Sequence, residues 1–176
     1  MEFLTLSPSL KNKLSKNEDR LLKDLAERSG AKLSIAGDEI EIEGDGWSEW
    51  ISIQVLQAFS LGFDEAKAFL LFDDEYFMEV LDLKNIFRGN EKLMERYKAR
   101  VIGTQGKARL KLEELSEAFI SISDEQIAII GKYEELRNAK EAVMRLFEGS
   151  THEVVYTFLE KRRHSMKKNE MGKGIQ

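Results

Sequence analysis

The sequence contains no cysteine, only two histidines and a single proline in 176 residues. The absence of cysteine excludes a disulfide framework, a thiol nucleophile and a thiolate metal site. No stretch approaches the roughly 18 consecutive apolar residues of a membrane-spanning helix, and the N-terminus lacks the basic start of a signal peptide. Because 42% of the residues are apolar, the chain is not disordered as a whole. These features predict a cytoplasmic protein with no membrane segment.

Catalytic constellations are also lacking. Neither His152 nor His164 has a partner at the spacing of a metal site or a catalytic triad. The acidic trio Asp73-Asp74-Glu75 is expected to form a polar turn or helix end rather than a metal site. No phosphate-binding loop of the Walker or dinucleotide type is present. The sequence therefore predicts a protein that is not an enzyme and holds neither cofactor nor metal.

Charge is distributed unevenly along the chain, whose net charge is −5. Residues 1–87 carry 9 Lys/Arg against 18 Asp/Glu, whereas residues 88–176 carry 18 against 14. The segment Arg88–Lys111 contains eight basic residues and only two acidic ones. Such asymmetry is typical of a chain whose basic half contacts a polyanion, although a solvated basic helix face gives the same pattern.

The sequence repeats itself at an offset of 87 residues. The pairs that coincide are Ser29/Ser116, Ala31/Ala118, Leu33/Ile120, Ser34/Ser121, Ile35/Ile122, Ile40/Ile127, Ile42/Ile129 and Gly44/Gly131. The register then slips by one, which pairs Val55 with Val143 and Phe59 with Phe147. The chain therefore consists of two copies of one module.

Both copies predict the same elements: a leading strand, a helix, two alternating strands and a long amphipathic helix. The expected strands are Glu2–Leu6, Lys32–Ala36 and Glu39–Glu43 in the first copy, and Tyr76–Leu83, Phe119–Ser123 and Gln126–Ile130 in the second. The expected first helices are Asp19–Ser29 and Lys107–Ala118. The stripes expected to be buried on the long helices are Trp47, Trp50, Ile51, Val55, Ala58 and Phe59, and Leu136, Ala139, Val143, Leu146 and Phe147.

The remaining segments complete the organisation. A short helix is expected over Asp64–Phe72. After Gly149, a capping box of Ser150 and Glu153 opens a last helix, in which Val154, Val155, Phe158 and Leu159 are expected to be buried. The predicted fold is α+β, with a first domain over 1–72, a second over 73–164 and a polar, disordered tail over 165–176.

One loop of the second copy carries chemistry. The segment Gly103-Thr104-Gln105-Gly106 joins a basic helix to the next helix. Two glycines let the chain turn sharply and let a phosphate approach, and the following helix directs free N–H groups at that point. Arg100, Lys107 and Arg109 flank the loop, and cations at a helix N-terminus favour an anionic ligand. The alternative is that the glycines only form a helix–helix turn.

This order of elements around a GxxG loop resembles the type I KH domain, in which the loop clamps single-stranded nucleic acid. The resemblance implies a groove lined by Ile102, Ala108, Leu112, Ile120 and Ile122, with main-chain groups of Phe119–Ile122 reading a base edge. KH modules usually carry a branched aliphatic residue where this chain has Arg109.

The same departure, the paired modules and the C-terminal segment Val155-Tyr156-Thr157-Phe158-Leu159-Glu160-Lys161-Arg162-Arg163 resemble the KH proteins of small-subunit ribosome assembly, the partner-of-Nob (Dim/Krr-like) type in its archaeal form. The resemblance implies binding of single-stranded RNA near the 3′ end of 16S-type small-subunit rRNA. It implies two protein partners, the Nob endonuclease and the alpha subunit of initiation factor two. The residues expected to bind RNA are Arg100, Ile102, Gly103, Thr104, Gln105, Gly106, Lys107, Arg109, Leu112, Ile120, Ser121, Lys161, Arg162 and Arg163.

The first copy has lost the loop. At the offset, the GxxG corresponds to Lys16-Asn17-Glu18-Asp19, in which no glycine remains and two carboxylates would repel phosphate. We expect this degenerate module to serve as a structural or protein-binding surface. The alternative for the whole chain is a protein-interaction scaffold that has no RNA specificity of its own.

Overall fold

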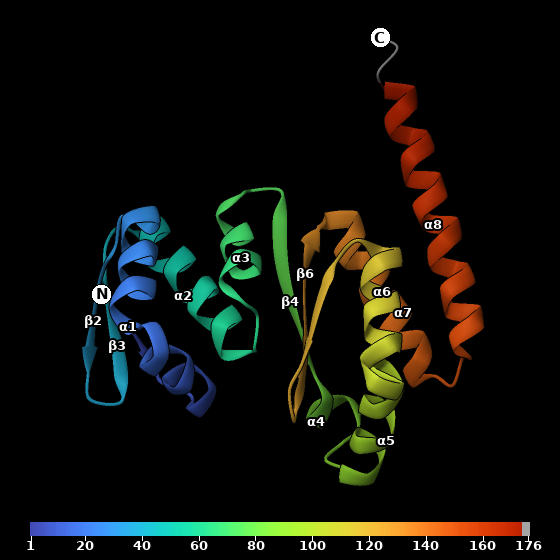
Figure 1. The fold of residues 1–176 in the computed structure, drawn as a ribbon, viewed down its shortest axis with the longest axis horizontal. Helices are drawn as coiled ribbons and strands as arrows, with labels where there is room; N and C mark the ends of the chain where they lie inside the picture. Colours follow the sequence, from blue (N-terminus) through green and yellow to red (C-terminus); the bar gives the residue numbers. More distant parts are fainter. Residues whose placement is uncertain (174–176) are drawn as a thin grey trace. The chain divides into compact units, whose positions relative to one another are not determined.

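The computed structural model describes residues 1–173, except for the side chains of residues 16–19. The chain divides into two compact units, Met1–Met78 and Glu79–Gln176. This division falls within the strand Tyr76–Asp82, a few residues beyond the expected boundary after residue 72. The expected replacement of the GxxG loop by Lys16-Asn17-Glu18-Asp19 concerns side chains outside the described part. Figure 1 shows the elements of both units.

The N-terminal unit builds a three-stranded sheet in the order β1-β3-β2. Its strands are β1 (Glu2–Thr5), β2 (Lys32–Ala36) and β3 (Glu39–Glu43), and both pairings are antiparallel. Its helices are α1 (Pro8–Ser29), α2 (Gly46–Ser60), α3 (Glu65–Ala68) and the 3-10 turn η1 (Phe69–Phe72). The first helix begins at Pro8 rather than at Asp19, because Ser7 caps it by accepting from the Leu10 N–H and proline suits the first helical position.

Alternation on β3 gives this unit its core, since Ile40 and Ile42 are fully buried while Glu39 and Glu43 are exposed. The α2 stripe differs from expectation. Trp47 and Trp50 are 54% and 57% exposed, so their predicted burial is wrong. Ser48 and Ser52 are buried instead. A Cβ on Gly44 would lie 2.9 Å from the Ser48 Cβ, which explains a small residue at position 48. The close approach of the backbones at this point admits only small side chains.

The C-terminal unit repeats the arrangement with a second three-stranded sheet, β4-β6-β5. Its strands are β4 (Tyr76–Asp82), β5 (Phe119–Ile122) and β6 (Gln126–Lys132). Its helical elements are α4 (Leu83–Ile86), α5 (Glu91–Ile102), η2 (Thr104–Gly106), α6 (Lys107–Ser116), α7 (Tyr133–Phe147) and α8 (His152–Lys173). The α+β class predicted from the repeat is confirmed.

The repeat extends to single hydrogen bonds. Ser29 Oγ accepts from the Ala31 N–H, and Ser116 Oγ accepts from the Ala118 N–H. The residues between them, Gly30 and Glu117, both end their helix in the left-handed conformation, with φ of 78° and 63°. The two modules therefore share the same helix-to-strand turn.

The last helix corrects three expectations. Thr151 rather than Ser150 caps α8, because its Oγ1 accepts from the Val154 N–H. Val155 and Leu159 are buried as expected, but Val154 is 53% exposed and Phe158 is half-buried, since both lie about 100° around the helix from the buried stripe. Residues 165–173 belong to the helix instead of a disordered tail, while the rest of that segment, 174–176, lies outside the described residues.

The acidic trio forms a turn. Asp73 accepts from the Glu75 N–H through its carboxylate and from the Tyr76 N–H through its carbonyl. Within residues 1–173, no group of three or more potential ligands is placed to hold a metal ion. In the same range, every helix is too short or too polar to cross a membrane.

Candidate nucleic-acid interface

The loop between α5 and α6 depends on two glycines with positive φ. Gly103 has φ 70° and Gly106 has φ 75°, a region that favours glycine. A Cβ on Gly103 would lie 2.5 Å from the Ala108 Cβ and 2.8 Å from its nitrogen. A Cβ on Gly106 would meet nothing within 4 Å. The first glycine therefore lets α6 pack onto the end of α5, whereas the second leaves its outer side open.

The middle of the loop faces solvent. Thr104 and Gln105 are exposed, and Gln105 has a left-handed conformation with φ 56°. The turn is closed by a 3.2 Å hydrogen bond from the Gly106 N–H to the Gly103 carbonyl. No side chain caps the N-terminus of α6. Lys107 is exposed there, and no ion pair among the described residues involves it. An anion can reach this helix end without displacing a side chain.

Arg100, which was expected to contact RNA, makes hydrogen bonds within the fold. Its two terminal nitrogens donate to the carbonyl oxygens of Leu146 and Ser150, both at 2.6 Å. Its own carbonyl bonds His152 Nε2 at 2.8 Å. These bonds tie the end of α5 to the connection between α7 and α8. The guanidinium is directed at main-chain oxygens rather than at the loop.

Arg109 is held against the edge of the sheet. Its Nη1 donates to Glu113 Oε2 at 3.1 Å and to the Ile120 carbonyl at 3.3 Å. The other carboxylate oxygen of Glu113 accepts from the Ile120 N–H at 2.7 Å. The main chain of Ile120, expected to be available to a base, is therefore occupied on both sides. Sequence reasoning missed Glu113, although its spacing of four residues from Arg109 on a predicted helix was a usable signal.

Fewer apolar residues are accessible to line the expected RNA-binding groove than the resemblance implied. Ala108, Leu112 and Ile120 are 6%, 0% and 2% exposed, so their side chains lie in the interior of the module instead of lining a groove. Ile102 and Ile122 are half-buried, and Ser121 is half-buried on β5. Leu110 on α6 is an exposed apolar residue that was not among those expected to bind RNA.

The basic residues of α8 are not brought to the loop. Arg163 pairs with Glu117 at 3.6 Å, and Glu117 follows the C-terminal end of α6. The loop precedes the N-terminal end of that helix, which at 10 residues is about 15 Å long. Arg163 therefore acts within the fold, away from Gly103 and Gly106.

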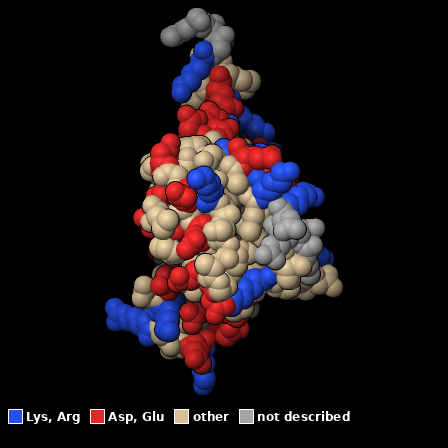
Figure 2. Space-filling model, turned by 90° about the vertical axis from the view of Figure 1, so that its left-hand side faces the viewer, with Lys and Arg blue, Asp and Glu red and all other residues tan. Residues whose placement is uncertain are grey.

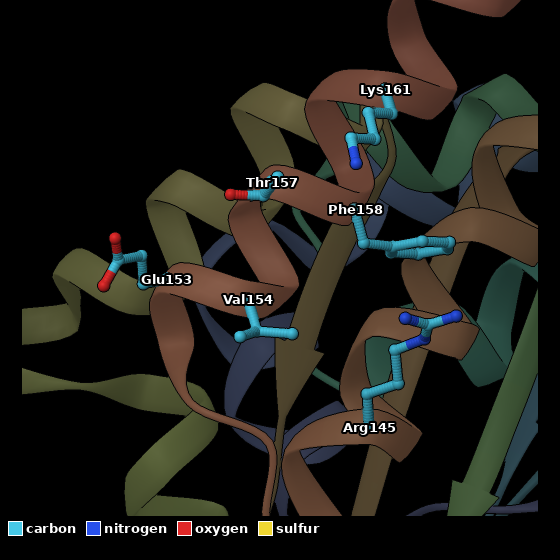
Figure 3. A pocket seen from close by; sticks show the side chains of 6 residues that line it. All are labelled: Arg145, Glu153, Val154, Thr157, Phe158 and Lys161. Carbon is cyan, nitrogen blue, oxygen red and sulfur yellow. The ribbon is translucent and has the colours of Figure 1, made fainter.

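Lys161 and Arg162 belong to a different surface. Phe158 lies beneath two guanidinium groups, with Arg145 at 4.0 Å and Arg162 at 5.4 Å from its ring centre. Lys161, Arg145 and Phe158 line a hollow of about 380 Å³ on α7 and α8 (Figure 3). Arg145 is also paired with Glu141 at 2.7 Å. The structure thus separates the expected RNA-binding set into the loop, the Arg109 edge and this aromatic–basic surface.

Part of the basic segment Arg88–Lys111 is also neutralised within the fold. Lys98 pairs with Glu95 at 2.9 Å and with Asp124 at 3.8 Å, and only 11% of its side chain is exposed. Lys111 pairs with Glu114 at 3.2 Å. The local positive charge available to a ligand is therefore smaller than the composition indicated.

Comparison with known proteins identifies the module that carries this loop. The model of the eukaryotic-type (type I) KH domain, in the form of the second domain of PNO1, matches residues 77–164. The chain is 34% identical over 152 residues to a KH domain-containing protein of Methanocaldococcus jannaschii, an alignment covering 83% of this chain and 66% of that protein. It is 34% identical over 103 residues to the pre-rRNA-processing protein PNO1 of Coccidioides immitis, covering 57% of this chain and 40% of PNO1. The chain thus spans less than two thirds of the length of these curated relatives.

A solved structure extends the likeness to nearly the whole chain. The structure of a complex of a/eIF2alpha, aDim2p and rRNA from Pyrococcus horikoshii contains a chain that matches with a TM-score of 0.82 and 27% identity, covering 93% of this chain and 94% of that one. The predicted pair of KH domains is confirmed, and the chain belongs to the PNO1/Dim2 family of KH-domain proteins.

Proposed function

We propose that this chain is a small-subunit ribosome-assembly factor of the cytoplasm that binds the 3′ region of 16S-type rRNA as a single strand. The second KH domain makes the contact, and the loop Gly103–Gly106 holds the phosphate backbone. The observation that carries the proposal is the solvent-exposed loop at an uncapped helix N-terminus. The family consists of non-enzymatic RNA-binding assembly factors, and a homologue was solved in complex with rRNA.

Phosphate contacts near the loop are few. Among the described residues, Lys107 is the flanking cation for which neither an ion pair nor a hydrogen bond is found, so the loop itself supplies about one free cation to the phosphates. Single strands give a logarithmic salt dependence of about −0.7 per neutralised phosphate, so Lys107 alone gives a slope of about −0.7. The affinity from the loop is therefore modest. Contacts from Lys92 and Arg96 on α5 would strengthen binding and steepen the slope to about −2.

Introducing negative charge at the loop tests the proposal. The variant Thr104→Asp with Gln105→Asp places two carboxylates at exposed positions where phosphate is expected. The matched control is Asn12→Asp with Ser15→Asp, which adds the same charge at exposed positions of α1 in the N-terminal unit. We expect the loop variant to weaken binding of a small-subunit 3′ oligonucleotide by roughly tenfold or more and the control to leave it unchanged. Equal weakening by both variants, or by neither, contradicts the proposal.

A second function is supported by the N-terminal unit. The face shown in Figure 2 carries Asp and Glu side chains together with Lys and Arg side chains among uncharged ones. Two tryptophans of the chain, Trp47 and Trp50, are more than half exposed on α2. We propose that this unit binds protein rather than RNA, with the alpha subunit of initiation factor two as its partner and the Nob endonuclease as another partner of the chain. A homologue complex that contains a/eIF2alpha supports the first of these.

Titration calorimetry tests this assignment. The alpha subunit is titrated into the full chain and into the variant Trp47→Ala with Trp50→Ala. Loss of binding in the variant, with RNA affinity unchanged, supports the assignment. Full binding by the variant excludes these tryptophans as the contact.

A further inference from the structure

The strand β5 lies at an edge of its sheet, beside β6. Edge strands present unpaired N–H and C=O groups of alternate residues, which other chains or ligands can bind. Ile120 pairs in register with Ile129, and both of its main-chain groups are turned outward to α6. Two side chains of α6, Arg109 and Glu113, occupy them.

Both main-chain groups of Ile120 are hydrogen-bonded to these side chains, and the bonds are partly sheltered from water. Glu113 is 15% exposed and uses one carboxylate oxygen for the Ile120 N–H and the other for Arg109. The same Arg109 nitrogen reaches the Ile120 carbonyl. A base that approached this edge would have to break charge-assisted hydrogen bonds, which are about twice as strong as neutral ones.

The contacts of Arg109 and Glu113 with Ile120 change the hydrogen-bond donors and acceptors that a base would meet at β5. A free Ile120 would offer one donor beside one acceptor, which complements the Watson–Crick edges of adenine and cytosine. With Arg109 and Glu113 in place, neither group is free. The remaining hydrogen-bonding groups at this point are the other nitrogens of the guanidinium.

Those nitrogens present donors alone. Among the described residues, no hydrogen bond uses Nε or Nη2 of Arg109, and one third of the side chain is exposed. A planar pair of donors fits two adjacent acceptors, as in the O6 and N7 edge of guanine. A phosphate also offers adjacent acceptors, but the guanidinium is fixed against β5 and not over the loop where we place the phosphates.

We propose that the Arg109–Glu113 pair, rather than the main chain of β5, sets the base preference of this module and selects guanine at this edge. The inference rests on the proposed RNA binding of the second KH domain. Glu113 is the positioning residue, because it holds both the Ile120 N–H and the guanidinium. Arg109 is the residue that contacts the base.

Sequencing of RNA selected from a random single-stranded octamer pool tests the inference. The full chain is compared with the variant Arg109→Ile plus Glu113→Ala, which frees both main-chain groups of Ile120. The matched control is Lys111→Ile plus Glu114→Ala, which removes a more exposed ion pair from the same helix. A further variant, Arg109→Lys, keeps the charge but has no planar fork, so it keeps the fold if the double variant does not.

The expected results separate the inference from the proposed function. The wild type and the control enrich guanine at one position, and the double variant loses that enrichment by roughly tenfold and favours adenine or cytosine there. Arg109→Lys loses the guanine enrichment while total binding stays within about threefold, since its charge remains. Unchanged guanine enrichment in these variants overturns the inference. Equal weakening for all sequences also overturns it, because Arg109 then binds phosphate.

The proposed function fails in a different way. A wild-type chain that retains no RNA, or a Thr104→Asp plus Gln105→Asp variant that retains as much as the wild type, refutes RNA binding at the loop and the base preference with it. Retention that depends on the loop but shows adenine or cytosine at the selected position in the wild type refutes the base preference alone.

Discussion

The guanidinium of Arg100 donates a 2.6 Å hydrogen bond to the carbonyl of Ser150, 50 residues further along the chain. Lys13, which precedes Arg100 by the repeat offset of 87, donates to the carbonyl of Phe63, also 50 residues on. In both modules a cation, on α1 or on α5, therefore fixes the segment that follows the long helix, α2 or α7. Burial lowers the pKa of Lys13, in keeping with its part-buried contact with the Phe63 carbonyl. A contact kept by both copies, only one of which has a GxxG loop, serves folding.

Replacement of Arg100 tests this structural role. Arg100→Ala leaves the part-buried carbonyls of Leu146 and Ser150 without their donor and is expected to lower the free energy of unfolding by roughly 2–4 kcal/mol. Urea unfolding measures the change, and Lys92→Ala on α5 serves as an exposed control. Wild-type stability combined with lost RNA binding would show instead that Arg100 contacts RNA.

The two glycines of the loop should differ in their tolerance of alanine. Gly106→Ala meets open space and bears only the conformational cost of positive φ, about 1–2 kcal/mol. Gly103→Ala bears a higher conformational cost, because φ 70° with ψ 178° is a region essentially restricted to glycine, and it also places a methyl group 2.5 Å from the Ala108 Cβ, so α6 must move away from α5. Thermal unfolding should therefore show a larger loss for Gly103→Ala. An equal loss at both sites would contradict the packing described for Gly103.

The exposed tryptophans predict a small cost of truncation in the N-terminal unit. Trp47→Ala and Trp50→Ala should each change the unfolding free energy by less than about 1 kcal/mol, because neither side chain is in the core. Phe59→Ala, at a fully buried position of the same helix, should cost about 3–5 kcal/mol. Chemical denaturation followed by circular dichroism measures all three. A loss for Trp50→Ala as large as that for Phe59→Ala would show that the tryptophan is packed against something.

Asp45 gives the N-terminal unit a pH dependence of known sign. Its carboxylate caps α2, and hydrogen bonds from Ser48 lower its pKa below the usual value. Since the folded pKa lies below the unfolded one, the stabilisation is present above pH 3.8 and is lost as the pH falls through the lowered value. Fluorescence of the adjacent Trp47 and Trp50 reports unfolding from pH 6 to about pH 2. Asp45→Asn keeps the cap and should flatten the acid-side slope relative to the wild type, whereas an unchanged slope would assign it to other groups.

Sequence patterns predicted the module better than its surface. The Ile40/Ile127 and Ile42/Ile129 pairs located both middle strands, because alternation on a half-buried sheet is a local property of the chain. The burial of Trp47 and Trp50 was predicted wrongly, because hydrophobicity indicated an inward stripe while the close approach at Gly44 selected a small residue, Ser48, for the interior. Tight backbone packing between separate elements leaves no periodic trace in the sequence.

The candidate site shows the same limit. The GxxG loop was recognisable because its glycines and the flanking helices are contiguous in sequence. The roles of Arg100 and Arg109 were not, since their partners Ser150 and Ile120 lie 50 and 11 residues away, and any cation beside the loop looks equally available. Which positive charges remain free depends on tertiary contacts that composition does not encode.

We propose that RNA is held at Gly103–Gly106 of the second KH domain and not in the first. Amide chemical-shift mapping of the full chain, titrated with a single-stranded oligonucleotide from the 3′ end of small-subunit rRNA at low salt, tests it directly. The largest shifts should fall on Gly103–Arg109 and on β5, with α1 and α2 unchanged. Shifts concentrated on α1 and α2, with the loop unaffected, would contradict the account.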